Sequence, residues 1–371
     1  MAQTLTKRSI TNSSLLAWTL IGETSVANDN PGFDGYVTSD CGGIVNRVFN
    51  DHHYTQTPEE AVRDVFRAGL NVNCDDFGRR EVGYLQSALD QKLLTLAEVE
   101  KRLAEGFRVR MRLSHFDPTG PLQQIPLSEL CSAETAGIAR AGAAQGATLI
   151  KNTAGTLPLK RTLRSVAVIG PNSNLSEAVA GYYGGRQVCG GVYPSMIDAV
   201  RQYVPSAVSA TGVPSVRSNN TTDVAAAAAL AKGKDAVVLV LGTDLTIAKE
   251  GHDTDTISLS AGQQALLVAV AEAATSPVTV VLLTAVPLDI SSMLQNPNVG
   301  AILHAGQPSI QTLGIGDVLF GHTVPSGRMA RAWISAGQER GGRLVLFAFC
   351  SIRETQHGPR PCAVQVRSLE F

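Results

Sequence analysis

Three features are scarce in this 371-residue sequence: aromatic rings, an excess of charge of one sign, and long apolar runs. Aromatic residues make up only 5% of the chain, which is low for a stand-alone carbohydrate-binding module. The net charge of −1 creates no basic field that would attract nucleic acid or anionic lipid. No run approaches the ~18 apolar residues that a membrane-spanning helix needs. We therefore expect a neutral or small partner, no nucleic acid and no membrane.

Metal-ligand spacing is also missing. The six cysteines form no CxxC or Cys/His pattern, so we predict no metal and no cofactor. Their even number and wide spacing permit disulfides without requiring them.

The bulk composition is that of a soluble globular protein. Hydrophobic residues make up 44% of the chain, charged residues 17%, and the mean hydropathy is +0.07. A chain of this length favours two domains over one core.

Residues 1–27 form an unplaced N-terminus with two open interpretations. Lys7 and Arg8 precede a short apolar stretch at 15–21, and small residues at 25–27 resemble a signal-peptide cleavage site, whereas Glu23 spoils the pattern. Glycosylation triplets are compatible with secretion, and on this basis we expect an extracellular location; they begin at Asn12, Asn174, Asn219 and Asn220.

The first half contains a few short strands and helices. Turn residues at 32–35 lead into a β-prone run that ends on Asp40. A helix is predicted over 58–68 with proline and acids in its first turn, and Gly69 ends it before a second strand at 70–74. Thr95 and Glu98 form a capping-box pattern for a helix through 113. Residues 116–141 are interpreted as a linker.

The second half alternates strands with helices. Four Val/Leu/Ile-rich runs are predicted as strands, at 166–170, 236–242, 278–284 and 300–305. Helices are predicted at 223–232 and 263–274, the latter capped by Ser260. Continuous apolar strands between helices indicate a mainly parallel sheet covered on both faces, so we predict one α/β sandwich domain over 142–335. The tail 336–371 has no clear period and stays unplaced.

Several strings in order resemble one enzyme family. GFDGYVTSDCGG at 32–43 is similar to the nucleophile motif of family 3 glycoside hydrolases, in the β-xylosidase-like branch. Further similar strings occur at 53–61, 68–74, 108–110, 116–118, 146–152, 157–159, 166–172, 249–253, 300–306, 317–321 and 325–328. The resemblance covers roughly 28–335. It implies that 28–115 is the C-terminal part of a (β/α) barrel, because a full barrel needs ~250 residues.

The same resemblance assigns candidate site residues. Asp40 matches the nucleophile and Glu250 the general acid/base of a retaining exo-glycosidase. Retention requires one ionised and one protonated carboxyl group about 5–5.5 Å apart, and we predict the pair within ~5–8 Å. Tyr54, His252 and Asp253 are candidate substrate-binding residues. Without the flanking motifs, Asp40 would be a cap or turn residue and Glu250 an exposed loop acid.

Two cysteines near the predicted nucleophile refine the resemblance to the family. Cys41 beside the nucleophile is similar to xylosidases of the family, and Cys74 on the next strand is its predicted disulfide partner, with two buried free thiols as the alternative.

The sequence also departs from the family's pattern at several positions. Thr254 stands where the family usually has Arg, and Ser260–Ala261 replaces its Pro-Gly. The family's Lys-His pair and its upstream Asp and Arg, which hold the sugar, have no match, and the tail does not resemble the family's fibronectin-like domain.

We therefore expect a retaining exo-β-glycosidase, a β-D-xylosidase acting on xylo-oligosaccharides, impaired by truncation. The alternatives are a β-glucosidase of the same family, a non-catalytic remnant that binds sugar weakly, and a truncated gene product with no function of its own. An incomplete barrel exposes strand edges, so a partner chain or oligomer is also expected.

Overall fold

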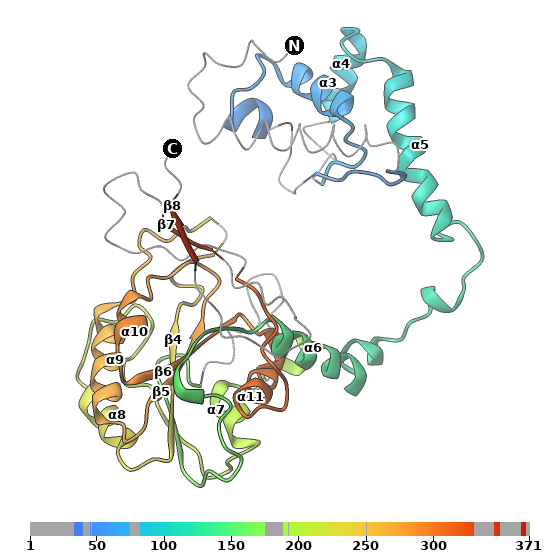
Figure 1. The fold of residues 1–371 in the computed structure, drawn as a ribbon. Helices are drawn as coiled ribbons and strands as arrows, with labels where there is room; N and C mark the ends of the chain where they lie inside the picture. The colour runs from blue at the N-terminus through green and yellow to red at the C-terminus, as the bar shows by residue number, and fades with distance from the viewer. Residues whose placement is uncertain are drawn as a thin grey trace. The chain divides into compact units, whose positions relative to one another are not determined.

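The structure is a computed structural model that describes residues 33–39, 45, 47–74, 82–174, 188–191, 193–249, 251–329, 345–348 and 365–368. The chain divides into two compact units, Met1–Ile125 and Pro126–Phe371 (Figure 1). In the described part of the chain, no helix has the length and apolar composition required to cross a bilayer.

The main helices of unit 1 among its described residues are η1 (Arg47–Asp51), α3 (Pro58–Ala68), α4 (Val82–Asp90) and α5 (Leu96–Arg112). The predicted bounds of α3 are confirmed, because Thr57 forms a capping box with Glu60 and Gly69 ends the helix in the left-handed region at φ 112°. Thr95 and Glu98 cap α5 in the same way. A small apolar cluster joins η1, α3 and α4.

Unit 2 is a three-layer α/β sandwich around a six-stranded sheet. Its strands are β1 (Thr148–Asn152), β2 (Val166–Ile169), β3 (Val208–Ala210), β4 (Ala236–Gly242), β5 (Val278–Leu283) and β6 (Val299–Gly306), in the order β1-β6-β5-β4-β2-β3. Every neighbouring pair is parallel except β1 with β6. The predicted mainly parallel sandwich is confirmed.

Alternate residues of the buried strands feed two separate cores. In β4, Val238 and Val240 belong to one cluster, and Leu239 and Leu241 to the other. All seven β4 residues are buried, which explains the unbroken apolar sequence.

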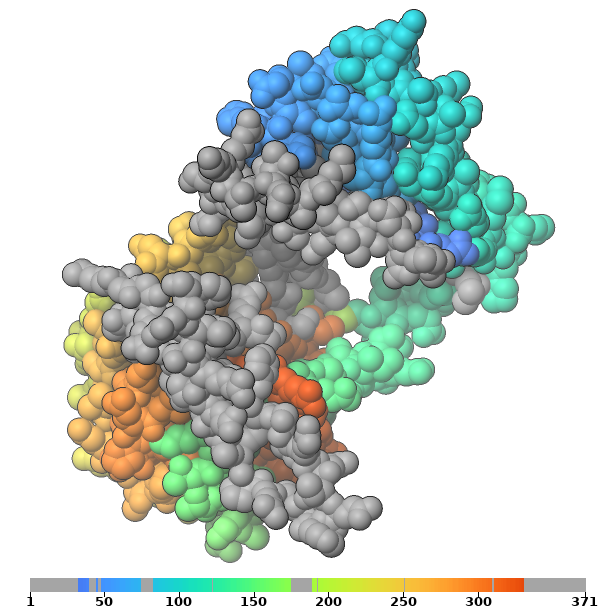
Figure 2. Space-filling model, turned by 45° about the horizontal axis from the view of Figure 1, so that its top comes forward, coloured from blue at the N-terminus to red at the C-terminus, as the bar shows by residue number. Residues whose placement is uncertain are grey.

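Helices cover both faces of the sheet. The first cluster includes residues of α6 (Ala133–Gly146), α7 (Met196–Arg201) and α11 (Leu313–Leu319), and the second includes residues of α8 (Val224–Ala231), α9 (Ala261–Ala273) and α10 (Ser291–Gln295). Helices α8 and α9 pack against each other, as the yellow and amber ribbon in Figure 1 and the same colours in Figure 2 show.

The remaining elements are short. The segment 116–141, interpreted as a linker, contains η3 (Pro121–Gln123), η4 (Leu127–Cys131) and the first part of α6. Unit 2 also holds η5 (Thr153–Gly155), η7 (Val188–Gly191) and η8 (Ser309–Gln311). In the tail, β7 (Val345–Ala348) pairs antiparallel with β8 (Gln365–Ser368).

Candidate active-site segments

The chain approaches position 40 through a short parallel pairing in unit 1. Thr38 bridges Val72, the Ser39 amide donates to the Val72 carbonyl at 2.9 Å, and the Val72 amide donates to the Val37 carbonyl at 3.1 Å. Parallel segments end at the same edge, so the run that leads to position 40 and the run 70–74 present their carboxyl ends together. Asp40, the predicted nucleophile, lies outside the described residues.

Buried and half-buried polar side chains hold these two segments in register. The Ser39 hydroxyl donates to Asn73 Oδ1 at 3.1 Å and accepts the Cys74 amide at 2.8 Å. The Asn71 side chain accepts the Val37 amide at 2.8 Å. Cys74 is disulfide-bonded, whereas Cys41, its predicted partner, lies outside the described residues, so this pairing stays a prediction.

Tyr54, a candidate substrate-binding residue, follows η1 in unit 1. Its backbone amide donates to the Val48 carbonyl at 2.9 Å, and 45% of the residue is exposed. The ring is therefore accessible, and its proposed role stays a prediction.

In unit 2, the loop that contains position 250 starts from the end of β4. Thr243 is anchored there, since its amide donates to the Leu283 carbonyl at 2.9 Å and its hydroxyl donates to the Thr284 hydroxyl at 2.9 Å. The Asn172 side chain, beyond β2, donates to the Thr243 carbonyl at 3.4 Å. The loop therefore begins from a fixed point in the sheet.

A tight turn brackets position 250. The Lys249 amide donates to the His252 carbonyl and the His252 amide donates to the Lys249 carbonyl, both at 3.0 Å. Gly251 has φ +70°, a conformation that costs a side-chain-bearing residue about 1 kcal/mol. His252 and Asp253 are exposed on this loop. Glu250 lies outside the described residues, so the predicted approach of the two catalytic carboxyl groups stays a prediction.

Beyond Asp253 the loop is held by its own hydroxyl groups. The Thr254 hydroxyl donates to the Thr256 carbonyl at 2.7 Å, and the Thr256 hydroxyl accepts the Ser258 amide at 3.1 Å. Thr254, which occupies the family's usual arginine position, therefore acts here as a turn residue. The Asp289 amide then donates to the Ile257 carbonyl at 2.8 Å, which ties the loop to the segment after β5.

The sheet topology marks the same edge as a place for function. From β2 the chain crosses to β3 on one side, and from β3 it returns to β4 on the other side of β2. In open parallel sheets, ligands bind outside the carboxyl ends of strands where the order reverses in this way. The loop that contains position 250 leaves the sheet at this switch point.

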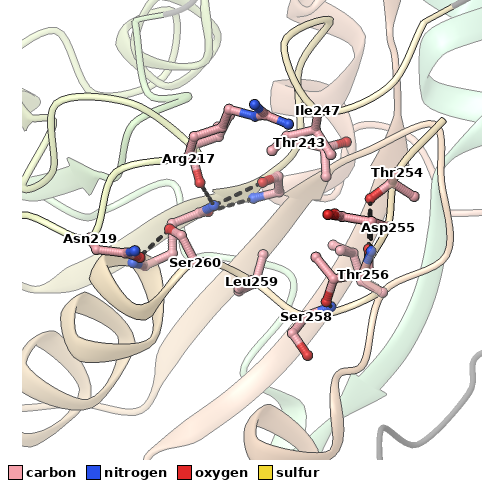
Figure 3. A pocket seen from close by; sticks show the side chains of 14 residues that line it. Arg217, Asn219, Thr243, Ile247, Thr254, Asp255, Thr256, Ser258, Leu259 and Ser260 are labelled. Carbon is pink, nitrogen blue, oxygen red and sulfur yellow. Dashed lines mark hydrogen bonds between the residues drawn. The ribbon is translucent and has the colours of Figure 1, made fainter. Parts of the chain in front are cut away.

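A pocket of ≈310 Å³ lies against the same loop, within unit 2 (Figure 3). One rim is the segment after β3, with Arg217 and Asn219, and the other is the loop segment around Asp255 and Ser258. Buried apolar side chains contribute to its lining, namely Val216, Leu259 and Leu288.

A partly buried ion pair outside this loop joins elements of unit 2. Asp317 in α11 is buried and accepts bonds from Arg140 Nε and Nη2, both at 2.6 Å, and from the Tyr203 hydroxyl at 2.5 Å. Burial acts to raise the pKa of Asp317, but the bonds from Arg140 and Tyr203 outweigh it and hold the pKa below the usual value. This cluster joins α6 and the turn after α7 to α11.

One covalent link was not predicted from the sequence. Cys131 in η4 is bonded to Cys189 in η7, at a sequence separation of 58. No spacing pattern singles out this pair, and only the fold brings the two cysteines together. Among the described residues, no three His, Cys, Asp or Glu side chains gather as metal ligands.

Known proteins resemble this chain over most of its length. A probable β-D-xylosidase of Arabidopsis thaliana is 38% identical over 315 residues, which cover 84% of this chain and 40% of that protein. A β-xylosidase/α-L-arabinofuranosidase of Medicago sativa subsp. varia is 35% identical and is covered to 38%. This chain therefore spans about 40% of the length of the curated relatives that it matches.

Solved structures share the fold. A family 3 exo-β-xylosidase in complex with a xylobiose aziridine probe matches with a TM-score of 0.70 and 28% identity, covering 82% of this chain and 39% of that one. A β-glucosidase from Listeria innocua in complex with isofagomine matches with a TM-score of 0.66 over 81% of this chain and 41% of that one, and at 21% identity it supports the fold alone. The model of the glycosyl hydrolase family 3 C-terminal domain matches residues 147–346, which is more than half of the chain. The chain belongs to glycosyl hydrolase family 3.

Proposed function

We propose that this chain carries the catalytic residues of a retaining exo-β-xylosidase that releases xylose from xylo-oligosaccharides during xylan breakdown. The observation that carries the proposal is the 38% identity to a probable β-D-xylosidase over 84% of the chain. The likeness to a xylosidase solved with a xylobiose-based probe supports the same substrate class.

In this proposal two acids divide the chemistry. Asp40 attacks the anomeric carbon as an ionised carboxylate, and Glu250 donates its proton to the departing oxygen. In the second step Glu250 removes a proton from water, which then displaces Asp40 from the sugar. The parallel pairing that leads to position 40 and the closed turn around position 250 support these assignments, since both acids need a fixed backbone.

We also propose that the protein works in an oxidising, extracellular compartment. The Cys131–Cys189 disulfide supports this location, because such bonds persist in secreted proteins and are rare in the cytosol.

Turnover of an aryl-β-xyloside by the full chain tests the proposal. We expect slow hydrolysis, because binding energy from sugar-holding groups normally supplies much of a glycosidase's rate, and the sequence lacks the family's Lys-His pair. Asp40→Asn abolishes the hydrolysis, whereas Asp90→Asn, the same change at an exposed position of α4, leaves it unchanged.

Substrates with different leaving groups distinguish the role of Glu250 from that of Asp40. Glu250→Gln slows a substrate with a poor leaving group strongly and one with a highly activated leaving group much less, because only the former needs protonation. Glu272→Gln, an exposed position on α9, is the matched control. Turnover that survives Asp40→Asn contradicts the proposed nucleophile. Sugar binding without any turnover supports the non-catalytic alternative instead.

A further inference from the structure

A pocket with both polar and apolar walls lies beside the 243–260 loop. Its ≈310 Å³ is formed within unit 2, so its walls do not depend on the other unit. That volume lies at the lower end of the range of about 300–1,000 Å³ found for small-molecule pockets. The question is which ligand chemistry its lining suits.

Polar groups face the pocket from opposite rims. Arg217 and Asn219 supply hydrogen-bond donors from the segment after β3, and Asp255 supplies a carboxylate acceptor from the loop. Figure 3 shows the Asp255 carboxylate directed toward the middle of the pocket, with Arg217 on the other side. Neither Arg217 nor Asp255 forms an ion pair or side-chain hydrogen bond with another described residue. Both groups are therefore available to a ligand.

The rest of the lining is uncharged. Ser258 lies on the same rim as Asp255, and Leu259 and Leu288 provide buried apolar surface. The one arginine and the one aspartate cancel, so the lining has no net charge. A compound that both donates and accepts through several hydroxyl groups, and that carries C–H faces, matches this combination.

An anion fits less well. The first amides of α9 would attract one, but the Ala261 amide already donates to Asn219 Oδ1 at 3.0 Å. The Gln263 amide likewise donates to the Ser260 hydroxyl at 3.3 Å. The Asp255 carboxylate on the facing rim would also repel an anion.

We propose that this pocket binds a short neutral oligosaccharide. Arg217 donates hydrogen bonds to the sugar from one rim, and Asp255 accepts them from the other. Because one wall is the loop that contains position 250, an occupied pocket holds this loop in place. No aromatic ring lines the pocket, so the sugar lacks a stacking partner and binds weakly. The choice of xylobiose as the ligand rests on the proposed function, whereas the pocket chemistry requires only a neutral sugar.

Direct binding tests the proposal without any need for turnover. The unglycosylated full chain is used, since Asn219 begins a glycosylation triplet, and xylobiose binding is measured by saturation-transfer NMR and titration calorimetry. Arg217→Ala and Asp255→Ala each weaken binding by about tenfold, the loss expected for one hydrogen bond to a charged group. Ser258→Trp fills the pocket and abolishes binding.

Matched control variants distinguish a loss of binding at the pocket from the effects of removing a charge elsewhere or of unfolding the chain. Arg161→Ala and Asp223→Ala remove the same charges at exposed positions of unit 2 and leave binding unchanged. Circular dichroism confirms that each variant is folded, and Arg217→Lys restores part of the affinity.

Different results would contradict the pocket proposal and the proposed function. Absence of xylobiose binding, or binding unaffected by the three pocket variants, overturns the pocket proposal. Inorganic phosphate that competes with xylobiose overturns its neutral-sugar part. Binding of cellobiose in place of xylobiose supports the pocket and contradicts the xyloside substrate class of the proposed function. Binding lost only in Asp40→Asn or Glu250→Gln supports the proposed function and refutes the pocket.

Discussion

Replacing Asp317 by asparagine should destabilise unit 2 more than the corresponding change at any other carboxylate that the structure describes in that unit. The Asp317 carboxylate is buried in α11 and accepts two bonds at 2.6 Å from Arg140 and one at 2.5 Å from Tyr203. Asparagine keeps the shape but places an amide donor against a guanidinium donor. The link between α6, α7 and α11 is therefore lost in part.

The magnitude follows from the partial exposure of the pair. Removing one partner of a fully buried ion pair costs about 3–5 kcal/mol. The Arg140 side chain is 35% exposed, so water recovers part of the loss, and we expect about 2–4 kcal/mol. Tyr203→Phe removes one hydroxyl bond and keeps the ring stacked on Phe320 at 4.5 Å, so it costs about 1 kcal/mol.

Urea unfolding followed by far-UV circular dichroism measures these differences. Asp223→Asn, an exposed carboxylate with no side-chain bond at the start of α8, is the control and stays within about 0.5 kcal/mol of the parent chain. A double-mutant cycle with Arg140→Met isolates the pair. A loss below about 1 kcal/mol in Asp317→Asn, or no coupling in the cycle, refutes the assignment of this cluster as a structural link.

The same variant has a defined pH dependence. The pKa of Asp317 is held below its usual value, so the folded state binds this proton less readily than the unfolded chain. Its stabilisation is complete above the unfolded pKa of about 3.9 and is lost as the pH falls through the lower folded pKa. The stability gap between the parent chain and Asp317→Asn should be constant near neutral pH and shrink below about pH 4. A gap that is unchanged in acid contradicts this linkage.

Three further changes test other parts of the fold. Cys131→Ser with Cys189→Ser opens a loop of 58 residues and should cost about 4 kcal/mol by the chain-entropy relation, measured by urea unfolding with and without reductant. Gly242→Ala would place its Cβ against the Leu283 carbonyl at φ +138° and should cost more than about 3 kcal/mol, or yield insoluble protein. Thr57→Ala removes the α3 cap and should cost about 1 kcal/mol, whereas Thr57→Ser should be nearly neutral.

Local signals in the sequence predict the parts of the fold that depend on near neighbours. The apolar run of β4 gives a buried strand with the predicted bounds, since its residues need no polar face. The predicted caps at Thr95 and Ser260 mark helix starts, because each side chain bonds an amide three residues ahead.

Other elements depend on distant contacts and leave no local signal. Helix α6 contains three glycines in 14 residues and buries little of itself, so no apolar stripe predicts it. Its close packing depends on Gly314 of α11, where any Cβ would meet the Arg140 carbonyl. The antiparallel direction of β1 is likewise set by its partner β6, because a short apolar run carries no information about direction.

The residues of the candidate site also fall into those that the sequence predicts and those that it does not. Asp40 and Glu250 are predicted because each lies inside a string that resembles the family, and because these strings occur in the family's order. The pocket was not predicted, since Arg217 and Asp255 come from different loops and neither stands in a recognisable pattern. Folding of the β3 and β4 loops onto one edge of the sheet brings them together.

Covalent trapping of the nucleophile tests the central proposal most directly. The chain is incubated with an activated 2-deoxy-2-fluoro-β-xyloside, which forms the glycosyl-enzyme readily and releases it slowly, and the labelled peptide is identified by mass spectrometry. The proposal predicts one added sugar per chain, attached at Asp40, and no label in Asp40→Asn. A label on another residue, or no label on the folded chain, would contradict the assignment of Asp40 as the nucleophile of a retaining xylosidase.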